Sequence, residues 1–323
     1  MPFSSVTGHR PAVDLLTRAV ARHSLPPSLI FAGPEGVGKR RTAIALAQAL
    51  NCDRGGCGTC ASCTRIARGV HADVLIVEPG DSGTIKVDQV RDAIDRTAYR
   101  PFEGRRRVVI VDQADALQSE AQNALLKTLE EPPPASVFVL VTARPDMLLP
   151  TVRSRCQRVR FGPLTAQEVA AVLIAEHGLA APDAHAAAAA ADGSVGRALE
   201  EGADEAIEAR EAATRVLGAA ASADVRRRLD AAKALVGGAG DRDDVSRRLL
   251  AMSSLLRDLG VLAAGADTAK LANADLEPQL QALRRTFDAR RALEAFAVVD
   301  RALAALDRNA SPKIVADWVT LHL

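Results

Sequence analysis

The feature that most constrains the fold of this chain is a regular alternation of short apolar runs and helical patterns in its first 161 residues. Apolar, β-branched runs bounded by turn or charged residues predict buried strands. Such runs lie at 28–32, 74–77, 108–111 and 137–141, with a shorter one at 159–161. Helical patterns lie at 10–23, 39–50, 87–98 and 115–131. This alternation predicts an α/β domain: a parallel sheet with helices on both faces.

Strand patterns stop after Pro163. Three short helices are predicted at 165–177, 183–191 and 194–201, and the remainder is helical with polar breaks near 237–243, 264–268 and 307–312. We therefore expect three domains: an α/β domain over 1–161, a small helical domain over 162–205 and a larger all-α domain over 206–323. Aromatic residues make up only 3% of the chain, so the cores must consist largely of Ala, Val and Leu.

Charge and hydropathy exclude two broad classes. The formal net charge is +1, which excludes a strongly basic nucleic-acid-binding protein. No stretch of 18 apolar residues suggests a membrane span, and the first residues do not form the apolar core of a signal peptide. The expectation is a cytoplasmic protein.

Residues 33–39 read GPEGVGK, which fits the P-loop pattern G-x-x-x-x-G-K. The motif lies between a predicted strand and a predicted helix, as it must to bind phosphates. Gly33, Gly36 and Gly38 would let backbone N–H groups surround phosphates at the helix N-terminus, and Lys39 would reach the terminal phosphates. The alternative is a glycine-rich turn without a ligand.

Two departures from the P-loop ATPase pattern affect catalysis. Arg40 stands where a Ser or Thr hydroxyl would bind Mg²⁺, and Thr42 lies on the wrong side of the helix to replace it. Asp112 follows an apolar strand, as the second metal-site carboxylate should, but Gln113 replaces the carboxylate that activates water. Asp115 is expected to be a helix N-cap. The altered site leaves nucleotide binding open, but we expect no hydrolysis.

Four of the five cysteines lie within twelve residues, at Cys52, Cys57, Cys60 and Cys63. In a cytosolic protein, this clustering favours a metal over disulfides. Four thiolates at short spacing predict a closed, structural zinc site. An iron–sulfur cluster, redox pairing and chance clustering are the alternatives. His71 is close in sequence, but four cysteines already complete the shell.

Arg155, in the tripeptide Ser154-Arg155-Cys156, precedes the last predicted strand. An arginine at the edge of a domain can enter a neighbour's ATP site and stabilise charge on the γ-phosphoryl group. The alternative is an ordinary surface arginine. The arginine runs 105–107 and 226–228 are expected to be solvated faces, with DNA contact as the alternative, chiefly for the first.

Taken together, these motifs resemble the AAA+ clamp-loader family of bacterial DNA polymerase III over nearly the whole chain. The resemblance rests on residues 8–11 with Leu15 and Leu16, 33–39, the four-cysteine insertion, 123–133 and 154–156. Residues 71–74 and 85–91 are similar to segments of the delta-prime subunits of the family. Its motor subunits have a hydroxyl residue at position 40, Glu at 113 and a long C-terminal extension, none of which we expect here.

The resemblance implies a RecA-like AAA+ domain, a helical lid and a helical collar that assembles the complex. It implies one copy in a pentamer with motor and delta subunits, which opens the sliding clamp and loads it onto primer–template DNA during replication at the nucleoid. By residue match, Arg155 would act in trans, while Thr142 and Arg197 occupy the sensor-1 and sensor-2 positions of an ATP site.

Two other functions compete with this one. The first is an active motor ATPase, which Arg40 and Gln113 count against. The second is a zinc-dependent nucleic-acid module. That module would need basic and aromatic residues beside the cysteines, but the loop offers only Arg54 and Arg65 and no aromatic residue.

Overall fold

The computed structural model describes residues 3–200, 202–220, 224–237, 241–268 and 271–323. The chain forms two compact units, Met1–Pro163 and Leu164–Leu323. None of the helices in the described ranges is both long and apolar enough to cross a membrane.

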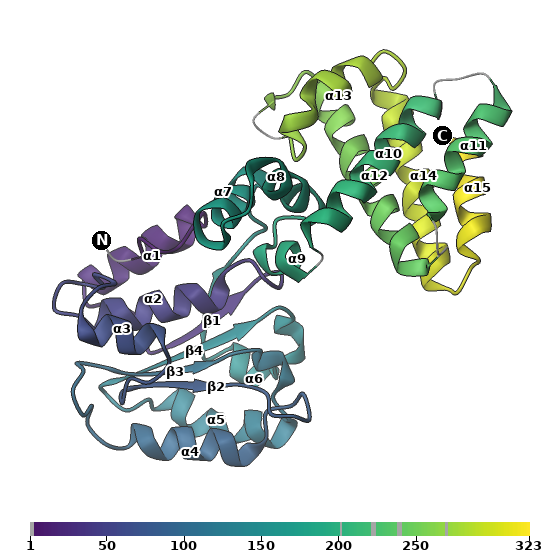
Figure 1. Cartoon of the computed structure of the whole chain (residues 1–323). Coiled ribbons are helices and arrows are strands. Elements are labelled where there is room, and N and C mark those ends of the chain that lie inside the picture. Colours follow the sequence, from purple (N-terminus) through teal and green to yellow (C-terminus); the bar gives the residue numbers. More distant parts are fainter. Residues whose placement is uncertain (1–2, 201, 221–223, 238–240, 269–270) are drawn as a thin grey trace. The chain divides into compact units, whose positions relative to one another are not determined.

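The first unit contains one five-stranded sheet, in which every pairing is parallel. Its strands are β1 (Ser28–Ala32), β2 (Val74–Val77), β3 (Arg107–Val111), β4 (Ser136–Thr142) and β5 (Gln157–Arg160). Their spatial order is β2-β3-β4-β1-β5. Figure 1 shows the first four of these strands in that order. The predicted parallel α/β sheet is confirmed, and all four longer strand predictions agree with the observed bounds to within one residue.

The carboxyl ends of the strands meet at one edge of the sheet. In the register, Ala32 of β1 pairs with Thr142 of β4, and Val77 of β2 pairs with Val111 of β3. In parallel α/β sheets, ligands bind beyond this edge. The residues that follow the strands therefore mark the candidate site.

Helices cover both faces of this sheet (Figure 1). One face packs against α1 (Arg10–Ala21), α2 (Lys39–Asn51) and α3 (Ala61–Ala67). The other packs against α4 (Val87–Thr97), α5 (Ser119–Glu130) and α6 (Pro150–Arg153). Successive strand residues alternate between the two cores: Phe31 belongs to the first and Ile30 to the second. Because both faces are covered, the strands read as continuous apolar runs rather than alternating patterns.

One predicted helix is divided. The pattern at 115–131 forms a 3₁₀ turn, η1 (Ala114–Ala116), followed by α5. Between them, Leu117 is extended and forms a parallel bridge with Ile85. Ile85 bonds to the residues on either side of Leu117: its N–H donates to the carbonyl of Ala116, and its carbonyl accepts from the N–H of Gln118. This strand-like pairing interrupts the helix. A second 3₁₀ turn, η2, spans Pro145–Met147.

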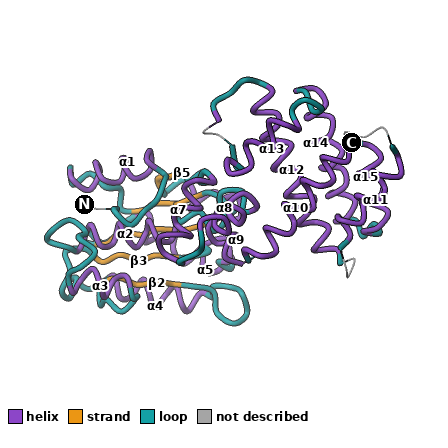
Figure 2. The backbone as a smooth tube through the Cα atoms, turned by 45° about the horizontal axis from the view of Figure 1, so that its top comes forward, coloured by secondary structure: helices purple, strands orange, loops and turns teal. Residues whose placement is uncertain are grey.

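The described parts of the second unit are helical (Figure 2). A short first group, α7 (Ala166–His177), α8 (Ala181–Ala190) and α9 (Val195–Glu200), surrounds an alanine-rich core. The following helices share a separate core: α10 (Ala203–Ala220), α11 (Val225–Val236), α12 (Arg242–Ala263), η4 (Ala274–Leu276), α13 (Glu277–Leu283), α14 (Ala289–Asp307) and α15 (Pro312–His322). The three short helices and the three predicted breaks correspond to observed elements, except that residues 201 and 238–240 lie outside the described residues. A further break at 284–288, between α13 and α14, was not predicted.

Candidate functional site

The P-loop connects β1 to α2, as the sequence predicts. Gly33 passes so close to the backbone of Phe161 that a Cβ atom there would lie 2.1 Å from the Phe161 carbonyl oxygen. Gly36 and Gly38 have φ angles of 70° and 99°. These are left-handed conformations, which glycine adopts without a steric penalty. The three glycines are therefore required by the backbone geometry of the loop.

Lys39 is buried and turns toward the loop itself. Its Nζ donates to the carbonyl of Gly33 at 2.9 Å and to that of Pro34. Burial lowers the pKa of Lys39, even though neighbouring carboxylates act in the opposite direction. The hydroxyl of Thr42 donates to the carbonyl of Gly38 at 3.0 Å, so it is already engaged in a hydrogen bond within its own helix.

Arg40 makes contacts that the sequence did not reveal. Its Nη1 lies 3.1 Å from Oδ2 of Asp112, the carboxylate that follows β3. The same Nη1 pairs with Glu78, which follows β2. Arg40 thereby joins the start of α2 to the ends of two strands. Its guanidinium lies at the Asp112 carboxylate that a P-loop ATPase offers to its metal.

Asp115 corrects one sequence prediction. It lies inside η1 rather than at a helix N-cap, and Gln118 is the N-cap residue of α5. Its carboxylate accepts a hydrogen bond from the hydroxyl of Thr142 at 2.9 Å and one from Nε of Arg144 at 3.0 Å. Burial alone would raise the pKa of Asp115, but these hydrogen bonds lower it. The hydroxyl of Thr142, the predicted sensor-1 residue, is thus bonded to a carboxylate of its own chain.

Two further residues complete the surroundings of the P-loop. Gln113 is exposed in a left-handed conformation, and its N–H donates to Oδ1 of Asp112 at 3.1 Å. His9 lies in the segment 8–11 on which the family resemblance partly rests. Its Nε2 is 2.7 Å from the carbonyl of Val37, and its ring packs edge-on against Phe161. The N-terminal segment therefore contacts the P-loop directly.

Arg155 lies between α6 and β5, and its guanidinium is held rather than free. Nε donates to Oε1 of Glu130 at 2.8 Å, and Nη2 pairs with the same carboxylate. Nη1 donates to the carbonyl of Thr151 at 2.9 Å. The side chain remains 31% exposed. Glu130 ends α5 and lies in the segment 123–133 that carries part of the resemblance, but its contact with Arg155 was not predicted from the sequence.

Arg197, the predicted sensor-2 residue, belongs to α9 in the second unit. It is half-buried, and its backbone N–H donates to the hydroxyl of Ser194 at 3.2 Å.

The four predicted metal ligands converge. The sulfurs of Cys52, Cys57, Cys60 and Cys63 all lie within 4.8 Å of one another, close enough to hold a metal ion. Backbone N–H groups of Thr59 and Cys60 lower the pKa of Cys57 to about 5, which favours the thiolate form that binds metals. Burial raises the pKa of Cys63 to about 12. The arrangement fits a closed four-thiolate site with no position left for a substrate.

A polar network adjoins this cluster and corrects the expectation for Arg107. That residue is buried and pairs with Asp73, Nη2 to Oδ1, at 2.7 Å. Burial alone would raise the pKa of Asp73, but backbone N–H groups of residues 102–104 and the Arg107 guanidinium lower it to about 2. The loop before β3 is therefore fixed from inside. The prediction that residues 105–107 form a solvated face is therefore wrong for Arg107, which is buried.

The same loop is tied to the cysteine segment. Oδ1 of Asn51, the residue before Cys52, accepts from the backbone N–H groups of Arg105 and Arg106, each at 2.9 Å. Arg65 of α3 pairs with Glu103 at 2.7 Å. His71 is also buried nearby, with Nε2 3.2 Å from the hydroxyl of Ser62, and it is not one of the four grouped ligands.

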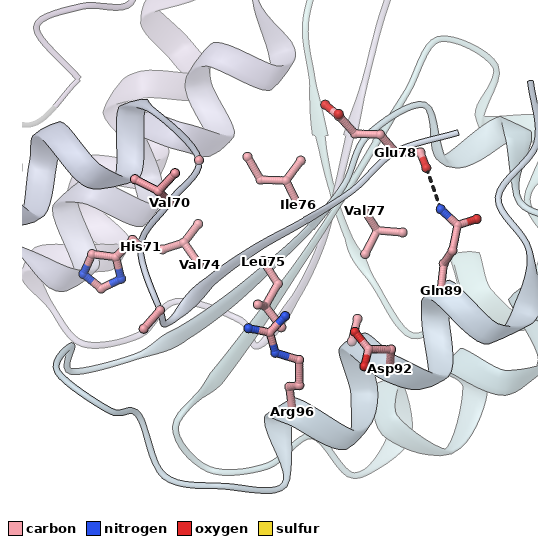
Figure 3. A pocket seen from close by; sticks show the side chains of 13 residues that line it. Val70, His71, Val74, Leu75, Ile76, Val77, Glu78, Gln89, Asp92 and Arg96 are labelled. Atoms are coloured by element: carbon pink, nitrogen blue, oxygen red, sulfur yellow. Dashed lines mark hydrogen bonds between the residues drawn. The ribbon is translucent and has the colours of Figure 1, made fainter. Parts of the chain in front are cut away.

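A groove of about 460 Å³ runs along the edge strand β2 and is bordered by α4 (Figure 3). Gln89, Asp92 and Arg96 reach it from α4, and Gln89 donates to the carbonyl of Glu78 at 2.9 Å. Glu78 lines the groove and also pairs with Arg40. The lining contains none of the predicted site residues.

In comparisons with known proteins, a family model matches the N-terminal part of the chain. Residues 8–165 match the family described as DNA polymerase III, delta subunit. The chain is 43% identical over 129 residues to the delta' subunit of DNA polymerase III from Pseudomonas aeruginosa, which covers 38% of this chain and 39% of that protein. It is 34% identical over 189 residues to the gamma/tau subunit from Mycobacterium tuberculosis, covering 56% of this chain and 33% of that protein. The chain thus spans about a third of the length of such relatives.

Solved structures also match along most of the chain, at low similarity. A gamma subunit-related protein of DNA polymerase III from Thermotoga maritima has a TM-score of 0.39 at 20% identity, covering 95% of this chain and 98% of that one. The clamp loader delta protein of Bacillus subtilis has a TM-score of 0.38 at 13% identity, covering 96% and 98%.

Proposed function

Because residues 8–165 match the family described as DNA polymerase III, delta subunit, we propose that the protein works as a delta-prime-type subunit of a clamp loader. In this role it assembles with motor subunits and a delta subunit, and the complex loads a sliding clamp onto primed DNA at the replisome. The chain supports ATP hydrolysis by its neighbours without hydrolysing ATP itself.

The observation that carries this proposal is the ion pair of Arg40 with Asp112 in an otherwise well-formed P-loop domain. Hydrolysis by such a domain needs a metal and a carboxylate that activates water. Here a guanidinium pairs with the metal-site carboxylate, and Gln113 replaces the second carboxylate. These contacts count against the alternative of an active motor ATPase.

The catalytic contribution then comes from Arg155, which we place in trans at a neighbouring subunit's ATP. Glu130 and the carbonyl of Thr151 hold the guanidinium in one orientation while leaving part of it exposed. A positioned guanidinium loses less conformational entropy when it meets a phosphate. Glu130 is thus a positioning residue for Arg155.

The remaining parts have supporting roles in this proposal. The four cysteines hold one structural Zn²⁺. Residues 162–205 form the lid and 206–323 the collar through which the complex assembles; the separate cores of the two helical groups support this division. Sensor residues Thr142 and Arg197 serve no hydrolysis in this chain.

The test is reconstitution with motor and delta subunits, followed by measurement of clamp- and DNA-stimulated ATP turnover at saturating ATP. An arginine supplied in trans is worth about 10³–10⁵ in rate in GTPases. In a motor with several sites, Arg155→Ala should lower kcat less, because other sites keep turning over. Arg155→Lys should rescue poorly, since lysine lacks the planar fork of donors.

Two variants sharpen this experiment. Arg153→Ala is the matched control, because Arg153 lies two residues away and pairs with Asp146 instead; turnover should be unchanged. Glu130→Gln should give a smaller loss than Arg155→Ala and no loss of assembly. Equal ATP turnover by complexes that contain Arg155→Ala or wild type would show that Arg155 contributes nothing to catalysis and that the chain is only a structural subunit.

A further inference from the structure

The edge strand β5 carries unused backbone hydrogen-bonding groups on its outer side. It pairs only with β1 and lies at the edge of the sheet opposite β2 (Figure 2). The N–H of Phe161 donates to the carbonyl of Ala32 in β1 at 2.8 Å, and alternate residues of a parallel strand bond to the same neighbour. The backbone groups of Arg158 and Arg160 therefore point away from β1. Of these groups, only the Arg158 carbonyl has a partner within the described ranges, the amide of Gln157 at 3.4 Å.

A groove of about 460 Å³ adjoins this edge on the side of the sheet that α1 covers. Its apolar lining comes from α1, β1 and β5, and includes Leu15, Leu16, Leu29 and Val159. Leu15 is exposed, whereas Val159 belongs to the core beneath α1. In the described part of the chain, the lining contains neither an acidic nor an aromatic residue. Apolar side chains of a strand added beside β5 could therefore be covered on this face.

Four exposed arginines surround the same edge strand. Arg18 and Arg22 line the groove on the α1 side. Arg158 and Arg160 lie on the opposite face of the sheet, because Val159 between them packs beneath α1 and side chains alternate along a strand. Among the residues that the structure describes, none forms an ion pair or side-chain hydrogen bond with any of the four. Both faces of the edge therefore present unpaired positive charge.

These features match an extended acidic peptide better than a nucleic acid. Backbone N–H and C=O groups along an edge strand pair with a second extended backbone. Single-stranded nucleic acids instead stack their bases on aromatic side chains, and the described lining of the groove has none. Arginine forms strong, charge-assisted hydrogen bonds with carboxylates. A strand beside β5 would find such donors on both of its faces.

We propose that β5 and its groove bind an extended segment of a partner protein in which acidic and apolar residues alternate. The segment adds to the five-stranded sheet as a further strand beside β5. Its apolar side chains lie in the groove, and its acidic side chains on the other face meet Arg158 and Arg160. Acidic residues that flank the segment meet Arg18 and Arg22. This interaction goes beyond the proposed function and does not depend on it.

The probe is a fluorescein-labelled ten-residue peptide of Glu-Val repeats, and its binding to the full chain is measured by fluorescence anisotropy. The wild type should bind it with a Kd of about 100 μM or tighter. Arg158→Glu combined with Arg160→Glu should weaken binding at least about tenfold, because like charges then face each other. The matched control combines Arg284→Glu with Arg285→Glu, the same change of charge at two exposed arginines of the second unit. It should bind like wild type, and thermal unfolding checks that both variants are folded.

Two modified peptides separate strand addition from attraction between charges alone. In an added strand, only every second N–H faces β5, so these N–H groups all belong either to the valines or to the glutamates. Methylation of the valine or of the glutamate amide nitrogens leaves the peptide charge unchanged. One of the two peptides should lose binding at least about tenfold, and the other should keep its affinity within about threefold. Loss on valine methylation indicates a strand parallel to β5, and loss on glutamate methylation an antiparallel one.

Absence of binding at millimolar peptide would overturn the proposal. Equal losses in the two double variants, or equal affinities of the two methylated peptides, would overturn it as well, because either result leaves only unspecific attraction between charges. Tighter binding of a labelled ten-nucleotide single-stranded DNA, weakened by the change at Arg158 and Arg160, would assign these arginines to nucleic acid instead. All of these measurements use the isolated chain, so failure of this inference is distinguishable from failure of the proposed function.

Discussion

The two ends of helix α2 gather charged groups in opposite ways. At its first turn, Arg40 meets Asp112 and Glu78, so two carboxylates face a cation from the protein itself. At its other end, Asn51 leads into Cys52, and four thiols gather within 4.8 Å. At the first site, the carboxylates are paired with a side-chain cation of the same chain. At the second, the four thiols are ligands suited to a metal ion taken up from solution.

This difference shows which interactions stabilise each end of α2. Arginine replaces a metal ion only in charge, because its hydrogen bonds to carboxylates are directional and it binds no oxygen ligand. Thiolates crowded together repel one another unless a metal neutralises them. We therefore expect the start of α2 to tolerate metal removal and the end of α2 to depend on metal.

The largest expected loss of stability follows removal of the metal. Cys57→Ser should lower the zinc content from close to one ion per chain and unfold the segment around residues 52–63, because structural zinc contributes on the order of 10 kcal/mol in small zinc-binding peptides. Elemental analysis and thermal unfolding measure both. Cys156→Ser is the matched control, since Cys156 lies outside the cluster. Zinc-free wild-type protein with unchanged thermal stability would break the comparison.

A smaller effect is expected from the buried ion pair beside the cysteine segment. Asp73→Asn should lower the free energy of unfolding by about 3–5 kcal/mol, because it leaves the Arg107 charge buried without a partner. Denaturant titration measures the change. Asp53→Asn is a suitable control, since Asp53 pairs with Arg105 at the surface. Equal losses in the two variants would show that burial of the pair contributes nothing.

The pH dependence of the same residue follows from its lowered pKa. The pKa of Asp73 falls from 3.8 to about 2 on folding, so its ionised form stabilises the fold above pH 3.8. That contribution, about 2 kcal/mol, is lost as the pH falls through about 2. The difference in unfolding free energy between wild type and Asp73→Asn should therefore shrink between pH 5 and pH 2. A constant difference over this range would contradict the assignment.

The smallest effect is expected at the other end of α2. Gln113→Glu restores the carboxylate that activates water, but Arg40 still pairs with the metal-site carboxylate. Unfolding free energy should change by less than about 0.5 kcal/mol, since Gln113 is exposed. Steady-state phosphate release should stay at background, and a gain is expected only when Arg40→Ser is added. Turnover near about 1 s⁻¹ by the single variant would contradict this.

Much of the fold could be predicted because its signals are local. Strands buried on both faces must be apolar over their whole length, so β1 and β2 could be placed to the residue. The helix expected over 115–131 was wrong in part, because Leu117 pairs with Ile85, a residue far away in sequence. Asp115 was misplaced as a helix cap for the same reason.

The sequence by itself determined the ingredients of the two sites: a P-loop with Arg40 in place of a hydroxyl, and four cysteines at metal-binding spacing. Only the tertiary structure decided what those residues do. It brought Asp112 to Arg40 across 72 positions and Glu130 to Arg155 across 25. Side-chain pairs of this kind depend on which strand ends meet at one edge of the sheet, and strand order is set by packing rather than by any local pattern.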